Sequence, residues 1–387
     1  MEPALAGAAP PAGRSAPLPW TLVVMLVGST GIVVGLLWDI SWHMTIGRDT
    51  FWTPAHMAIY LGGVLAGLAC GFLALKTTFA GTDEERETTV RFWGFRAPLG
   101  AWLAIWGSFA MLTSAPFDDW WHNAYGLDVE ILSPPHAVLG LGMIAIQVGA
   151  MLMVLARQNR AAESDLGPLS FAHLYAAGIV LLMAATMFTE YSEPNLMHGV
   201  RFYQVSCALY PLFLVAVARS SRSRWAATRM AAFYMAIALA MAWILPLFPA
   251  QPKLGPINNP VDHMVPPLFP LLLVIPALAI DLVLQRAPGK RAGWAAALVL
   301  GVSFLALFLA VQWPFARFLL SPAANNWFFL GDRIWDYGST PGPWQHQFWT
   351  FRNDPVTPRA LGLALLLGCA ACGLGLSWGS WMAKVRR

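Results

Sequence analysis

Long runs of apolar residues, separated by short polar stretches, make up most of this chain. A helix needs about 20 apolar residues to cross the roughly 30 Å hydrocarbon core of a bilayer. The pattern predicts an all-α, polytopic integral membrane bundle. It indicates about ten transmembrane helices, at residues 20–39, 55–76, 97–116, 135–156, 170–190, 199–218, 225–247, 266–285, 292–315 and 359–382.

Lys and Arg are unevenly distributed among the polar stretches. With the N-terminus in the cytoplasm, 17 of the 24 Lys and Arg residues lie on the inner side and 7 on the outer side. Cytoplasmic loops of membrane proteins are enriched in these residues. We therefore expect both termini inside, in a multi-pass protein of the bacterial inner membrane. Residues 1–19, rich in Ala and Pro, are expected to form a disordered tail rather than a cleaved signal.

Composition agrees with a membrane protein and limits the other possibilities. Of the 387 residues, 57% are hydrophobic and 11% are charged, whereas soluble domains have about 25% charged residues. The net charge of +4 follows from the cytoplasmic flanks of the spans, so no nucleic-acid partner is expected. All four cysteines fall within apolar spans, and the pair Cys369 and Cys372 is interpreted as small buried hydrophobes rather than a metal or redox motif.

A polar motif occurs twice at the ends of predicted spans. Residues 38–56 read WDISWHMTIGRDTFWTPAH and residues 117–136 read FDDWWHNAYGLDVEILSPPH. Both contain D-x-x-W-H-x-x-x-G-x-D followed by [ST]-P-x-H at the start of the next span. The repeat predicts a duplicated four-helix unit at 20–156 and a six-helix region at 157–387, with an aromatic outer loop at 316–358.

The spacing of the motif predicts a convergent site in each copy. An Asp and a His four residues apart lie on the same face of a helix, and a turn with Gly and Pro can direct the next histidine toward them. Two imidazoles and one carboxylate suit Zn(II), Fe(II) or Cu(II). A hydrogen-bonded polar cluster that caps two helices is the alternative. The candidate ligands are Asp39, His43 and His56 in the first copy and Asp118, His122 and His136 in the second.

The first copy resembles the signature D-x-x-x-H-x(12)-H of the C subunit of particulate methane monooxygenase and ammonia monooxygenase, the copper membrane monooxygenases. The resemblance covers about residues 35–150 and implies that Asp39, His43 and His56 hold a catalytic copper. The second copy is similar to the family's second copper site, although the family has Asn where this chain has Asp118. The motif also closes the first span here, whereas in the family it lies in the later half of the chain.

The resemblance implies an enzyme that oxidises a small hydrocarbon or ammonia with O2. It further implies partner membrane subunits and a periplasmic subunit with a copper domain, because this chain has no cupredoxin-like domain. The metal sites would then face the periplasm. Two alternatives stay open: a copper-binding or copper-handling membrane protein without catalysis, and a structural or quinone-binding membrane subunit.

Several further polar residues are weaker candidates. Arg48, Asp49 and Asp128 are expected to support the ligands from outside the metal's coordination sphere. Asp119 is interpreted as a solvated neighbour of Asp118, and His173 as a residue at the start of a span. Accessory roles are considered for two outer loops, which contain Glu190, Glu193 and His198, and Asp262 and His263.

Overall fold

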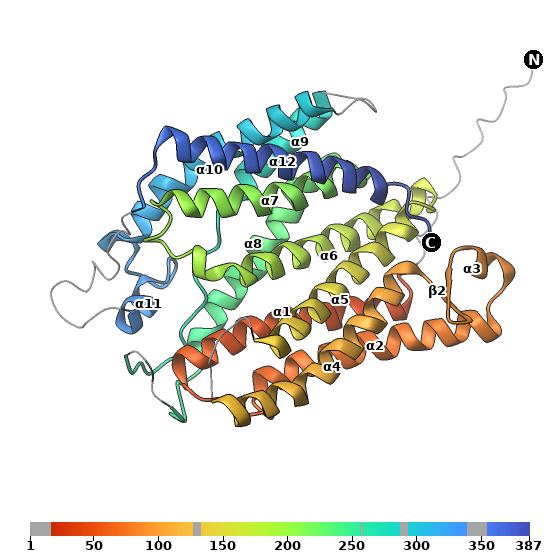
Figure 1. The fold of residues 1–387 in the computed structure, drawn as a ribbon, viewed down its shortest axis with the longest axis horizontal. Helices are drawn as coiled ribbons and strands as arrows, with labels where there is room; N and C mark the ends of the chain where they lie inside the picture. The colour runs from red at the N-terminus through yellow and green to blue at the C-terminus, as the bar shows by residue number, and fades with distance from the viewer. Residues whose placement is uncertain (1–16, 127–132, 256, 258, 287–292, 339–353) are drawn as a thin grey trace, which may run out of the picture.

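The computed structural model describes residues 17–126, 133–255, 257, 259–286, 293–338 and 354–387. Most of these residues are helical, and the long helices lie side by side along one direction (Figure 1). In chain order the helices are α1 (Trp20–Thr45), α2 (Pro54–Ala80), α3 (Asp83–Glu87), α4 (Leu99–Tyr125), α5 (Pro134–Gln158), α6 (Leu166–Met187), α7 (Val200–Ser220), α8 (Ala226–Ile244), α9 (Val274–Arg286), α10 (Trp294–Leu319), α11 (Gly331–Gly338) and α12 (Pro358–Met382).

Eight helices in the described part of the chain are long and apolar enough to cross a membrane: α1, α2, α5, α6, α7, α8 with its 3-10 extension to Leu247, α10 and α12. This supports a multi-pass helical membrane protein. The two remaining predicted spans correspond to α4 and to the segment that contains α9. The number of crossings and their orientation stay predictions.

The predicted helical span at 266–285 is helical only from Val274, because Pro266, Pro267 and Pro270 interrupt the preceding segment. Proline lacks the backbone donor that a helix requires. The free N–H groups of this segment are satisfied by side chains of other helices: Leu271 donates to the Tyr234 hydroxyl and Leu272 to Oε1 of Gln312. Such pairing is what makes irregular backbone tolerable inside a membrane protein.

One small β-hairpin departs from the all-α prediction. Strand β1 (Val90–Phe92) pairs antiparallel with β2 (Phe95–Ala97) between α3 and α4. Trp93 and Gly94, both with positive φ, form the two-residue turn between the strands, as expected for the turns that match strand twist. This hairpin lies at the same end of the bundle as the C-terminus (Figure 1).

The four helices of the repeat form two tight antiparallel pairs, α1 with α2 and α4 with α5, and α2 packs on α4. Each pair meets at facing glycines: a Cβ on Gly28 would lie 2.6 Å from the carbonyl oxygen of Gly62, and one on Gly107 would lie 2.6 Å from that of Gly142. Small residues of this kind let membrane helices approach closely. The two pairs therefore place both copies of the polar motif at one end of the bundle.

The C-terminal helices complete the bundle around the repeat. Helix α12 packs on α7 and α10, and α6 lies between α5 and α8. The predicted outer loop at 316–358 is partly helical, since α10 extends to Leu319 and α11 follows. The first 16 residues of the predicted tail and residues 339–353 of the predicted loop lie outside the described residues.

Candidate metal centre

The turn between α1 and α2 is fixed by local hydrogen bonds. Nε1 of Trp42 donates to the carbonyl of Arg48, and the N–H of Thr50 donates to the Thr53 hydroxyl. Gly47 adopts φ of +90°, a conformation that residues with a Cβ avoid. The turn thereby brings the start of α2 back beside the end of α1.

The first cluster contains four side chains, which we call site 1: Asp39, His43, Asp49 and His56. Nε2 of His56 lies 3.1 Å from Oδ1 of Asp39 and 3.2 Å from Oδ2 of Asp49. Nε2 of His43 lies 3.5 Å from Oδ2 of Asp49 and 3.9 Å from Oδ2 of Asp39. Ligand atoms from Asp39, Asp49 and His56 all lie within 4.8 Å of one another, a separation that one metal ion can bridge.

The contacts of His56 indicate which ring nitrogen faces the cluster's centre with a lone pair. Its Nδ1 lies 2.9 Å from the carbonyl oxygen of Thr50. A carbonyl only accepts, so Nδ1 carries the hydrogen and Nε2 is directed at the carboxylates. Histidines that bind metals through Nε2 commonly donate Nδ1–H to a carbonyl in this way.

A second feature of site 1 is a carboxylate oxygen without a hydrogen bond. Oδ1 of Asp39 is buried and accepts no hydrogen bond from any described residue, although Nε2 of His56 lies 3.1 Å away. With His56 neutral, the lone pairs of its Nε2 and of the carboxylate face one point, an arrangement that fits a bound cation.

The structure changes the role predicted for Asp49. We expected it to support the ligands together with Arg48, but its carboxylate lies among them. No ion pair between Arg48 and Asp49 occurs in the described structure, and Arg48 is exposed. Burial alone would raise the pKa of Asp49, but the hydrogen bond to His43 and the charges of His43 and His56 lower it to about 2. Asp49 is thus an anion that the two imidazoles stabilise.

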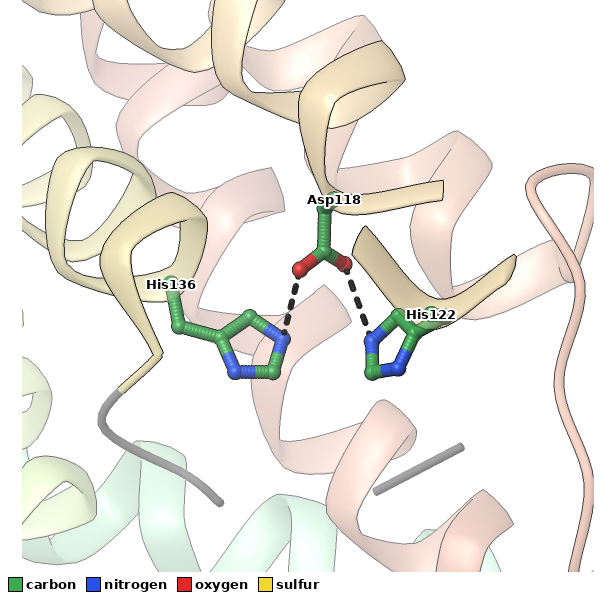
Figure 2. A group of neighbouring side chains, drawn as sticks. All are labelled: Asp118, His122 and His136. Carbon is green, nitrogen blue, oxygen red and sulfur yellow. Dashed lines mark ion pairs between the residues drawn. The ribbon is translucent and has the colours of Figure 1, made fainter. Parts of the chain in front are cut away.

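The second cluster, which we call site 2, contains Asp118, His122 and His136 (Figure 2). The carboxylate of Asp118 lies between the two rings. Its Oδ2 is 3.4 Å from Nε2 of His122, and its Oδ1 is 3.2 Å from Nε2 of His136. As at site 1, one carboxylate oxygen, Oδ1 of Asp118, is buried and accepts no hydrogen bond from the described residues.

The helix ends that form site 2 are held by contacts similar to those at site 1. Gly126 has φ of +106° and caps α4, and its carbonyl lies 3.4 Å from Nδ1 of His122. Ser133 accepts a hydrogen bond from the N–H of His136 at the start of α5. The Ser114 hydroxyl also donates to the carbonyl of Pro135 at 2.5 Å, which ties α4 to α5 near the cluster.

The second copy of the motif contains two further acidic residues, Asp119 and Asp128. Asp128, which the repeat aligns with Asp49, lies outside the described residues. Asp119 is exposed, and its carboxylate and backbone oxygens accept hydrogen bonds from the Asn123 amide. Asp119 is thus a solvent-exposed neighbour of Asp118 and not a member of site 2, as the sequence analysis predicted.

Site 1 has a support that the sequence analysis missed, the segment 253–265 between α8 and α9. The N–H groups of Leu254 and Gly255 donate to the carbonyl of Ile46. Nζ of Lys253 donates to the carbonyl of Thr45 at 2.9 Å, and Val265 N–H donates to the Thr45 hydroxyl. These bonds cap the end of α1, from which Asp39 and His43 project. Gly47 and Gly255 lie in contact. These two glycines were the signal in the sequence that the two segments could approach each other closely.

The remaining candidates do not join either group of ligands. Among the described residues, only the site 1 and site 2 ligands form groups of His, Cys, Asp and Glu that could hold a metal. His263 is bonded instead to Asp262 through Nδ1 and to the carbonyl of Arg333 through Nε2. All four cysteines are free, and His173 is buried within α6.

Comparison of the chain with protein-family models, with curated proteins and with solved structures gives no match. The chemistry of the two sites therefore rests on their own residues. The atoms close enough to share one cation come from Asp39, Asp49 and His56 at site 1 and from Asp118, His122 and His136 at site 2.

Proposed function

We propose that this chain is a membrane protein that binds a transition-metal ion, copper in preference, at site 1 and at site 2. The proposal rests above all on one observation: two hairpins about 80 residues apart in sequence repeat the same arrangement of carboxylate and imidazole. In each, one Nδ1 faces a backbone carbonyl while Nε2 faces the carboxylate. The contact involves the second histidine, His56, at site 1 and the first histidine, His122, at site 2.

The charges at the sites favour a metal over a purely structural cluster. Site 1 holds two carboxylates in a partly buried setting, with side-chain exposures of 15% for Asp39 and 21% for Asp49. Like charges this close repel each other unless a cation lies between them. Two protonated histidines could supply that charge, but a divalent ion satisfies both carboxylates and both imidazoles at once.

Copper is chosen on the resemblance of the first motif to that of the copper membrane monooxygenases. The donor set itself also suits Zn(II) and Fe(II). On this basis we assign the chain as a copper-holding subunit of a membrane oxidase that acts on a small hydrocarbon or ammonia with O2. Further membrane subunits and a periplasmic copper-domain subunit would complete the enzyme in the bacterial inner membrane.

In this role copper would supply the one-electron chemistry with O2, and the chain would supply the geometry of the site. Asp39 and His56 would hold the ion from two different helices, and Asp49 would add a second negative charge. The carbonyl of Thr50 would keep His56 in the tautomer that presents Nε2.

A second function, the binding and transfer of copper without catalysis, is favoured by the exposure of the sites. The side chains of His43 and His136 are each 32% exposed, and both sites lie at helix ends rather than in the middle of the bundle. An ion held there could be exchanged with a soluble carrier. Oxidation of a substrate by the complete complex would separate catalysis from transfer.

The test of metal binding is elemental analysis and electron paramagnetic resonance of the purified full-length protein. After copper-replete expression we expect about two copper ions per chain, falling to about one in His56→Ala and in His136→Ala. His198→Ala, which removes a histidine on another outer loop, serves as the matched control and should keep both. A protein that contains no copper, or only zinc, would contradict the proposal.

A further inference from the structure

A cavity of about 230 Å³ lies at the end of the bundle opposite the two metal sites. It forms where the start of α1, the end of α5 and the start of α6 meet. Its lining includes Leu18, Pro19, Arg157, Arg160, Asp165 and Leu169. The cavity is independent of sites 1 and 2, because no residue of either site contributes to it.

Two guanidinium groups give this cavity an excess of positive charge. In the described structure, neither Arg157 nor Arg160 forms an ion pair with a carboxylate, and Arg160 donates to the backbone carbonyl of Arg386. Burial lowers the pKa of Arg160, and the neighbouring charges of Arg157 and Arg386 lower it further. Asp165 is the one acidic residue in the lining. The lining therefore has two guanidinium groups and one carboxylate, which favours an anionic ligand.

The other walls of the cavity are apolar. Leu18, Pro19 and Leu169 line it beside the first turns of α1 and α6. A guanidinium group offers paired N–H donors that match the oxygens of a phosphate. Basic pockets between membrane helices at the cytoplasmic side are suited to phospholipid headgroups, and the distribution of Lys and Arg predicts that this end is cytoplasmic.

From this combination we infer that the cavity is a binding site for a phosphate group. The group can belong to an anionic phospholipid or to free inorganic phosphate. The apolar walls favour the lipid, since its glycerol and acyl carbons would contact Leu18 and Leu169 while Arg157 and Arg160 bind the phosphate.

Native mass spectrometry of the full-length protein in detergent tests this inference, with phosphatidylglycerol, phosphatidylcholine or inorganic phosphate added separately. We expect phosphatidylglycerol to bind at least about ten-fold more tightly than zwitterionic phosphatidylcholine. Binding of inorganic phosphate with no preference between the two lipids would support the site and assign free phosphate as its ligand. Binding of none of the three probes would overturn the inference.

The variant Arg157→Gln/Arg160→Gln should weaken binding of the preferred probe at least about ten-fold. Its control is Arg219→Gln/Arg229→Gln, which removes two arginines from α7 and α8 and should change binding less than about two-fold. An equal loss of binding affinity in the two variants would show that the probe is attracted to basic loops in general, and would overturn the inference of a specific site.

A third variant keeps the inference testable if the double substitution prevents folding. Asp165→Asn removes the acidic group from the lining and leaves both arginines in place. It should strengthen binding about three- to ten-fold, because the repulsion between a carboxylate and the phosphate is lost. Unchanged or weaker binding in Asp165→Asn would contradict a phosphate inside this cavity.

Discussion

Site 1 and site 2 begin from the same motif and differ in what the surrounding chain adds. Both place an Asp and a His four residues apart at a helix end and a second His in the first turn of the next helix. Site 1 also contains Asp49 and is braced by segment 253–265. In the described structure site 2 has Asp118 as its carboxylate, and its bracing comes from within its own pair of helices.

The two sites share the same Asp, His and His residues but differ in the net charge that surrounds a bound ion. Two carboxylates neutralise a divalent ion, whereas Asp118, the one carboxylate at site 2 among the described residues, leaves a net charge of about +1 at the metal. A neutralised ion in a partly buried site is bound more tightly and exchanges more slowly. We therefore expect site 1 to retain its metal and site 2 to exchange it.

The largest effect is expected from removal of the carboxylate that both histidines of a site share. Asp39→Ala should weaken metal binding at site 1 more than about 100-fold, since loss of a direct ligand exceeds the 10- to 100-fold typical of a supporting residue. Competition with a chelator of known affinity measures it. Asp118→Ala is the paired variant and should empty site 2 alone. Loss of both metals in either variant would show that the sites are not independent.

Asp49→Asn tests whether the negative charge of Asp49 contributes to metal binding at site 1. The substitution keeps the shape of the side chain and removes its charge, so metal affinity at site 1 should fall about 10- to 100-fold. Asp119→Asn is the matched control, because Asp119 is exposed beside site 2 and bonded to Asn123. An unchanged affinity in Asp49→Asn would show that the charge of Asp49 does not contribute to metal binding.

The smallest effect is expected from the turn itself. Gly47→Ala places a Cβ at positive φ, 2.7 Å from the carbonyl oxygen of Gly255, and should lower stability by about 1–3 kcal/mol. Thermal unfolding with and without copper measures it. Gly71→Ala is the control: it lies in the interior of α2 with no other atom within 4 Å of its Cβ position, and should stabilise by up to about 1 kcal/mol. Equal behaviour of the two variants would contradict a strained turn.

The pairing of Asp39 with His43 and of Asp118 with His122 could be predicted from the sequence because helical geometry alone brings residues i and i+4 together. The Gly and Pro of each motif further indicated that the chain reverses there. The place of Asp49 could not be predicted in this way, since it depends on the path of a turn. That path is set by bonds from Leu254 and Gly255, about 200 residues further along the chain, and no local spacing encodes them.

The membrane spans show a similar limit. Hydropathy located the long helices, because burial in lipid requires apolar residues along the whole length. It failed at 266–273, where the prolines within an apolar run exclude a helix. The partners that make an extended segment possible there, Tyr234 and Gln312, lie in other helices, so only the folded bundle reveals them.

Segment 253–265 also has a consequence for the order in which the protein matures. All described ligands and braces of site 2 are present in the chain once residue 136 has been synthesised, and α4 and α5 can pair once α5 is complete at Gln158. Site 1 acquires its ligands earlier, by residue 56, but Lys253, Leu254, Gly255 and Val265 are synthesised only after six further α-helices, α3 to α8. During biogenesis the first motif to be translated is therefore the last to be completed.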